Sequence, residues 1–169
     1  RSKLRGNSIG LVFQQFHLIP HLTALGNVST ALLYRELTKP EIRERSLAAL
    51  EMVGLGGRYD HRPIEMSGGE QQRVAIARAL VTDPLMILAD EPTGALDTKT
   101  ATIVMEIFKN LQSENRAIVL VTHDLEIAEQ MDRVVSMRDG KIVADDLRSE
   151  RTDALEDRFW EAGKGGKLE

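Results

Sequence analysis

Two short, continuous apolar segments in this sequence are each followed by polar side chains. Residues 85–89 read Leu-Met-Ile-Leu-Ala and precede Asp90 and Glu91, and residues 117–121 read Ala-Ile-Val-Leu-Val and end two positions before His123. Continuous apolarity is typical of strands that are covered on both faces, as in a parallel sheet. The sequence therefore predicts an α/β fold in which polar residues meet at the carboxyl edge of a parallel sheet, where such sheets place their sites.

Helix-like and strand-like segments alternate along most of the chain. The helix at 98–113 carries one apolar stripe, and Asp139-Gly140 is a strong two-residue hairpin signal. We expect a charged tail after residue 146. The full set of expected elements is strands at 8–14, 85–89 and 117–121, a hairpin of 133–138 and 141–144, and helices at 24–36, 40–53, 67–82, 98–113 and 125–130.

Composition excludes several classes of protein. The chain has 169 residues, 42% of them apolar, which suits one globular domain rather than disorder. A net charge of −4 gives no electrostatic reason to expect nucleic acid, and the lack of cysteine excludes disulfides. No apolar run approaches the roughly 20 residues that span a bilayer. Because the chain begins at Arg1 without methionine, we expect it to be a fragment or a processed chain.

Ser67, Gly68 and Gly69 open the helix at 67–82. The serine hydroxyl can cap the helix, and the two glycines leave the backbone open to close approach by a ligand. The positive end of the helix dipole then suits an anion such as phosphate. Taken alone, such a start is more often only a cap.

Asp90 and Glu91 are adjacent carboxylates at the end of a strand. Neighbouring strand residues point to opposite sides, so one carboxylate can hold Mg²⁺ while the other orients or deprotonates a water. Two acids near a turn can equally serve only as helix caps. Gln14 and His123 also follow strand-like segments, where either residue type is more often solvated or structural.

Longer segments around these residues resemble the motifs of ABC-type ATPases, and they occur in that family's order. Residues 9–14 followed by 18–20 resemble the Q-loop, and 67–80 resemble the signature motif. Residues 85–97 resemble the Walker B strand with its D-loop, and 121–124 resemble the switch histidine loop. Residues 22–28 and 90–97 look most like the bacterial lipoprotein-releasing, macrolide-exporting and cell-division subgroup.

The resemblance implies a role for each matched residue. Asp90 and Gln14 would hold Mg²⁺, Glu91 would be the catalytic base, and His123 would contact the γ-phosphate. The residues expected to meet the nucleotide are Ser67, Gly68, Gly69, Glu70, Gln71 and Asp97, with the signature residues facing ATP held by a second subunit. The implied cofactors are ATP and Mg²⁺.

The resemblance also implies partners and a location. These are a second ATPase subunit paired head to tail, a transmembrane permease subunit, and no nucleic acid. The protein would be cytoplasmic and peripheral on the inner face of the bacterial plasma membrane. The expected fold is a P-loop NTPase core, incomplete at its N-terminus, with an inserted α-helical subdomain. The expected divisions are core with the Q-loop strand at 1–15, helical subdomain and signature helix at 16–82, core again at 83–146, and tail at 147–169.

The family's phosphate-binding loop, Gly-x-x-x-x-Gly-Lys-Ser/Thr, does not occur in these 169 residues. Gly163-Lys164 and Gly166-Lys167 fail the pattern at both ends. We therefore expect the chain alone to hydrolyse ATP negligibly, because that loop supplies the phosphate cradle. Two alternatives stay open: an ABC ATPase that acts on DNA or ribosomes, and a non-catalytic interaction fragment.

Overall fold

The computed structural model describes residues 8–113 and 116–148, which fall into two compact units. The first ends at Val121 and the second starts at Thr122. In the described part of the chain, no helix is both long enough and apolar enough to cross a membrane.

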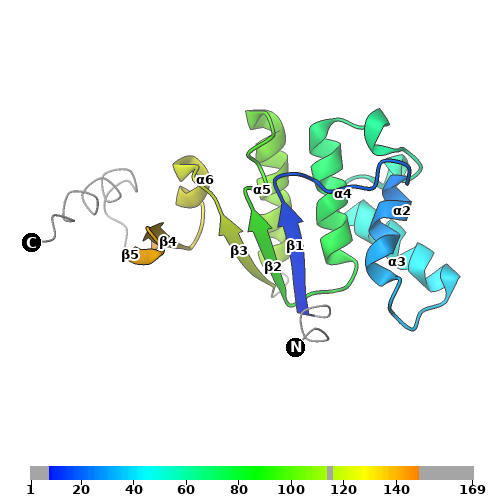
Figure 1. Ribbon diagram of the computed structural model, residues 1–169, viewed down its shortest axis with the longest axis horizontal. Helices are drawn as coiled ribbons and strands as arrows, with labels where there is room; N and C mark the ends of the chain where they lie inside the picture. The colour runs from blue at the N-terminus through cyan, green and yellow to red at the C-terminus, as the bar shows by residue number, and fades with distance from the viewer. Residues whose placement is uncertain (1–7, 114–115, 149–169) are drawn as a thin grey trace, which may run out of the picture. The chain divides into compact units, whose positions relative to one another are not determined.

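The first unit is built on a three-stranded parallel sheet. Its strands β1 (Ile9–Phe13), β2 (Met86–Asp90) and β3 (Ala117–Val121) lie side by side in the order β1-β2-β3 (Figure 1). The register aligns the last residues of the three strands, Phe13, Asp90 and Val121. The predicted parallel α/β sheet is therefore confirmed, and the polar residues that follow its strands start from one edge.

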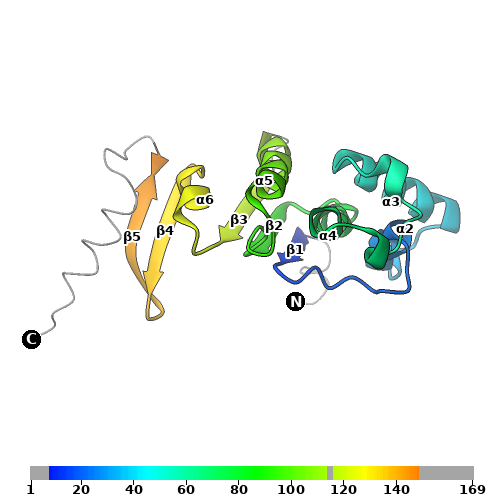
Figure 2. The ribbon, with the colours of Figure 1, turned by 90° about the horizontal axis from the view of Figure 1, so that it is seen from above.

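Two helices cover one face of this sheet. Helices α4 (Gly68–Leu80) and α5 (Thr98–Ser113) lie on the same side (Figure 2). The predicted stripe of α5 supplies Val104, Phe108 and Leu111 to the core. Helix α5 has the predicted bounds. Its apolar stripe lies within the helix, and Asp97, directly before the helix, bonds to the Thr100 hydroxyl in the first turn, so both signals are local in the sequence.

The opposite face of the sheet is open in the described residues. Side chains alternate along a strand, so every second residue faces away from α4 and α5. Leu11 is 47% exposed and Val121 is 51% exposed, and Phe13 lies on the same face. The expectation that both faces are covered is therefore not met here, since both packing helices lie on one side.

A helical segment connects β1 to α4. It consists of α2 (Ala24–Ser29), η1 (Thr30–Leu32), α3 (Lys39–Met52), η2 (Gly56–Arg58) and η3 (Pro63–Glu65). The helix expected at 24–36 is shorter, because the hydroxyls of Ser29 and Thr30 donate to backbone carbonyls and compete with regular helix. Helix α3 follows a Thr38–Glu41 capping box and ends before Gly54, whose φ is +71°.

The second unit contains α6 (Leu125–Glu129) and an antiparallel hairpin of β4 (Arg133–Arg138) and β5 (Lys141–Leu147). Asp139 and Gly140 have φ of +49° and +74°, as a tight hairpin turn requires, so the predicted hairpin is confirmed. Strand β5 runs past the expected end at residue 144. The later part of the predicted tail, residues 149–169, lies outside the described residues.

Gly10 permits close packing of β1 on α4, and we predict that enlarging it destabilises the fold. A Cβ at this position would lie 2.9 Å from the Ala79 carbonyl oxygen. Gly10→Ala should lower the free energy of unfolding by about 1–3 kcal/mol, because the backbone must shift to relieve the overlap. Urea unfolding measures the loss. Gly57→Ala is the control, since a Cβ there meets nothing within 4 Å; equal effects of the two substitutions would contradict the packing argument.

Candidate functional site

The turn after β2 holds Glu91 in an unusual backbone conformation. Glu91 has a φ of +45°, which costs a non-glycine residue about 1–3 kcal/mol. Its amide donates to the Val121 carbonyl at 2.8 Å, and its own carbonyl accepts from the Gly94 amide at 3.1 Å. These bonds hold the turn at the carboxyl edge of the sheet, directly after the exposed carboxylate of Asp90.

Gln14 lies against the same turn. A Cβ on Gly94 would be 2.9 Å from Gln14 Nε2 and 3.6 Å from Glu91 Cβ. A residue larger than glycine would therefore push against the Gln14 amide. The structure thus brings together Gln14 and Glu91, which are 77 positions apart in the sequence, at the end of neighbouring strands.

Ser67 caps helix α4, as the sequence predicts. The Glu70 amide donates to Ser67 Oγ at 3.3 Å, and the Ser67 amide donates back to Glu70 Oε2 at 2.9 Å. This reciprocal capping box leaves both residues at the exposed start of the helix. The Ser67 amide, followed by the bond from its hydroxyl, holds the pKa of Glu70 below its ordinary value, with a further contribution from Arg58.

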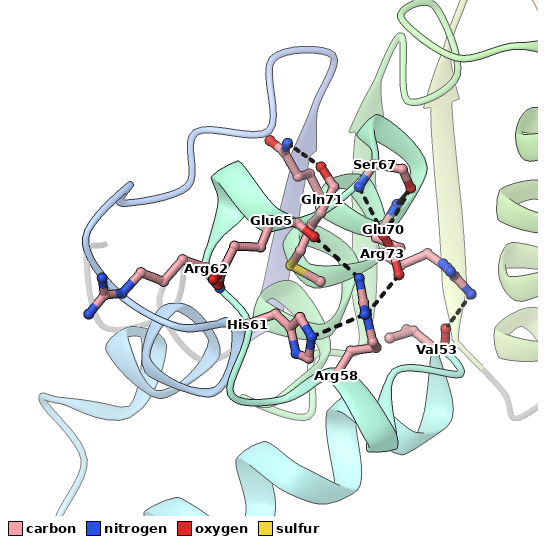
Figure 3. A network of polar contacts seen from close by, with 10 residues as sticks. Val53, Arg58, His61, Arg62, Glu65, Ser67, Glu70, Gln71 and Arg73 are labelled. Atoms are coloured by element: carbon pink, nitrogen blue, oxygen red, sulfur yellow. Dashed lines mark hydrogen bonds and ion pairs between the residues drawn. The ribbon is translucent and has the colours of Figure 1, made fainter.

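Arg58 links the preceding loop to this cap (Figure 3). Its Nε lies 3.1 Å from Glu70 Oε1, and its other guanidinium nitrogens contact His61 Nε2 and the Glu65 carbonyl. Gln71 donates from Nε2 to the carbonyls of Pro63 and Met66 at 2.9 and 3.1 Å. The side chains of Glu70 and Gln71 therefore have internal partners that shape the loop before Ser67.

The start of α4 also lies beside the turn that contains Asp97 and beside the loop that follows Gln14. A Cβ on Gly68 would lie 3.8 Å from Leu96 of the turn before α5 and 3.8 Å from Phe16. Asp97, next to Leu96, caps α5 by accepting from the Thr100 amide at 3.0 Å and the Thr100 hydroxyl at 2.7 Å. These bonds, the hydroxyl's first, lower the pKa of Asp97.

Gln72 is a residue of this site that sequence reasoning missed. It is fully buried, and its Nε2 donates to the Pro92 carbonyl at 2.7 Å and to the Phe13 carbonyl at 3.3 Å. Phe13 precedes Gln14, and Pro92 follows Glu91, so one side chain of α4 joins both segments. One feature of the sequence could have indicated that Gln72 is buried: this glutamine lies next to the apolar stretch of α4 that starts at Val74.

His123 follows β3 by two positions in the sequence and belongs to the second unit. Asp124, the next residue, caps α6 by accepting from the amides of Glu126 and Ile127. The first unit holds all the other predicted site residues.

Two side chains at this edge of the sheet carry oxygen atoms that suit a hard divalent cation. The carboxylate of Asp90 and the amide oxygen of Gln14 are of the type that Mg²⁺ prefers. In the described ranges, no group of three histidine, cysteine or acidic residues could hold a metal by itself. A cation here would take further ligands from phosphate and water, as Mg²⁺ usually does. The residues fit Mg²⁺ bound together with a nucleotide.

Comparisons with known proteins show which family the chain resembles. A family model described as ABC transporter matches residues 1–94. The lipoprotein-releasing system ATP-binding protein LolD of Pseudomonas fluorescens is 50% identical over 145 residues, 85% of this chain and 64% of LolD. The macrolide export ATP-binding/permease protein MacB of Chlorobaculum tepidum is 51% identical over 142 residues, 84% of this chain and 22% of MacB.

A solved structure is similar over most of the chain. It is a dimeric, post-hydrolysis state of the ATP-binding cassette MJ0796 bound to ADP and Pi, with 44% sequence identity and a TM-score of 0.77. The match covers 87% of this chain and 66% of that chain. The present chain spans 60–64% of the length of its curated stand-alone ATP-binding relatives.

We predict that Gln72→Met destabilises the protein although it keeps the side chain's length. The change leaves the carbonyls of Phe13 and Pro92 without this buried donor, at a cost of about 1–3 kcal/mol. Urea unfolding measures the effect. Gln15→Met, on an exposed loop residue, is the matched control and should change stability by less than about 0.5 kcal/mol. Similar losses for both variants would show that the buried bonds of Gln72 contribute nothing.

The lowered pKa of Glu70 predicts a pH-dependent contribution to stability. The contribution is fully present above the ordinary carboxyl pKa of 4.5 and is lost as pH falls through the lower folded value. The difference in unfolding free energy between the wild type and Glu70→Gln should therefore shrink as pH falls from 7 to below 4.5. Chemical unfolding at several pH values measures it. Glu44→Gln, on an exposed residue of α3, reports the general effect of removing one negative charge; a Glu70→Gln difference that grows toward low pH would contradict the prediction.

Proposed function

Because this chain belongs to the ABC transporter family, we propose that it is the ATP-binding and ATP-hydrolysing part of a transport complex. The observation that carries the proposal is the convergence of Gln14, Asp90 and Glu91 at one edge of the sheet. Sheets of this class place their ligands at that edge.

Each residue of this edge would have a separate task. Asp90 and Gln14 would hold the cation that accompanies ATP. Mg²⁺, when bound, offsets the charge that develops on the transferred phosphoryl group. Glu91 would orient the attacking water and accept its proton, and its fixed backbone supports that task because a general base must be placed accurately. His123 would donate a hydrogen bond to the γ-phosphate.

The start of α4 would serve a nucleotide held by a second copy of the protein. Ser67, Gly68 and Gly69 present a capped helix end without bulky side chains, which suits a phosphate. Glu70 and Gln71 would act by shaping this loop, since both side chains bond within the chain. The dimeric state of the MJ0796 structure supports a paired arrangement. Asp97 would lie where the two copies meet.

The whole protein would work together with a membrane partner. LolD and MacB are named for lipoprotein release and macrolide export, which supports a transmembrane permease as the partner and a location at the inner face of the bacterial plasma membrane. Residues 16–82 would be the helical subdomain that transmits motion to that partner. Residues 1–15 and 83–146 would form the ATPase core, and 147–169 would be a tail.

We predict that ATP turnover needs a phosphate-binding loop upstream of this sequence. The 169-residue chain should show negligible turnover, because it lacks the backbone cradle and lysine of that loop. A version extended upstream through the loop should turn over ATP. Glu91→Gln in that version should lose roughly 100-fold or more in kcat, because it removes the base. Steady-state phosphate release measures all three.

The matched control is Glu106→Gln, on an exposed residue of α5, which should leave kcat within about twofold. Equal turnover by the short and extended chains would contradict the need for the upstream loop. Full activity of Glu91→Gln would contradict the assignment of the base.

A further inference from the structure

Helices α4 and α5 touch where each begins. Gly69 is the second residue of α4 and is buried, and Thr100 is the third residue of α5. A Cβ placed on Gly69 would lie only 1.9 Å from Thr100 Cγ2. The two carbons cannot occupy these positions together, so the threonine methyl group packs directly on the glycine backbone. At the neighbouring Gly68, a Cβ would meet its nearest atoms at an ordinary 3.8 Å.

The hydroxyl group of the same side chain is bonded to Asp97. Thr100 Oγ1 donates to Asp97 Oδ2 at 2.7 Å, and the Thr100 amide donates to Asp97 Oδ1 at 3.0 Å. Threonine has few χ1 rotamers, because two heavy atoms branch from its Cβ. Rotation that moved the methyl group away from Gly69 would also take the hydroxyl from Asp97. The two contacts of Thr100 are therefore coupled.

We propose that Thr100 is a positioning residue that sets the spacing between the start of α4 and the turn at Asp97. Its methyl group would hold the Gly69 backbone while its hydroxyl holds Asp97. Glycine is then required at position 69 by a contact inside the chain, in addition to any need for close approach by a ligand. The consequence for ATP turnover rests on the proposed function, whereas the contact itself does not.

The contact can be tested by pairing a large and a small substitution. In the 169-residue chain, Gly69→Ala should lower the urea midpoint by roughly 1 M, because the new methyl group overlaps Thr100. Thr100→Ser in the same chain removes Cγ2 but keeps the hydroxyl for Asp97, so the double variant should recover at least half of that loss. Thr100→Val keeps a methyl group toward Gly69 and removes the hydroxyl, so it should rescue nothing. Gly68→Ala is the control and should leave the midpoint near that of the wild type.

The effect on positioning is tested in the version extended upstream through a phosphate-binding loop. Gly69→Ala should lower kcat roughly 10- to 100-fold, as misplacement of a catalytic segment by about 1 Å can do. Adding Thr100→Ser should restore kcat to within about threefold of Thr100→Ser alone, while Thr100→Val should not. Such rescue would not occur if position 69 matters only for ligand access.

Each failure has a separate meaning. Stability that is not rescued by Thr100→Ser would overturn the contact. Rescued stability with unrescued kcat would overturn the positioning role. An extended wild-type chain without ATP turnover would contradict the proposed function, while the stability measurements would still decide whether Thr100 sets the spacing between Gly69 and Asp97.

Discussion

Helix α4 is the element on which the packing of the first unit depends. It contacts α2, α3, α5 and β1, and most of its residues are buried. Small side chains make this possible: Gly10 on β1 faces Ala79 so closely that a Cβ would reach the Ala79 carbonyl. A helix so closely surrounded has little freedom to shift, because packed interiors leave few voids. The position of its first turn is consequently set by the core.

That constraint gives the polar contacts of α4 their importance. Gln72 reaches the backbone beside Gln14 and the backbone beside Glu91 with one buried amide. Arg58 and Glu70 hold the exposed end of the same helix. A displacement of α4 would therefore break two sets of contacts: the bonds of Gln72 to the backbone beside Gln14 and Glu91, and the ion pair between Arg58 and Glu70. The loops that carry the predicted site residues are irregular, but the helix to which they are bonded is largely buried.

Sequence reasoning could predict the elements with strong local signals. The capping serine at 67, the stripe of α5 and the Asp139-Gly140 turn each encode their structure within a few residues, and the structure agrees with them. The short α2 was not predicted: the expected helix ran over 24–36, whereas the hydroxyl bonds of Ser29 and Thr30 end the regular helix early. The open sheet face was not predicted either. Apolar residues in a strand indicate that its faces favour burial, but they do not indicate which element of the chain covers each face.

For the site, residue type and strand position left structural readings open for Gln14, Asp90 and Glu91, and the resemblance to ABC-type ATPases singled them out. Their grouping at one edge follows from the parallel topology. Gln72 and Thr100 could not be found in this way. Their roles depend on which backbone segments converge on them, and those segments lie 20 or more positions away: Pro92 for Gln72, Gly69 for Thr100. The spacing of residues along the sequence does not predict such long-range contacts.

The strained turn at Glu91 connects the site to the end of β3. The Val121 carbonyl that holds the Glu91 amide belongs to the last residue of that strand, directly before the segment with His123. If β3 shifted along its axis, this bond would lengthen and the positive φ of Glu91 would lose its support, because such a conformation persists only where its surroundings hold it. The direction of the Glu91 side chain is thus coupled to the residue after which the second unit begins. A shift of β3 would therefore weaken the support on which the placement of the Glu91 carboxylate depends.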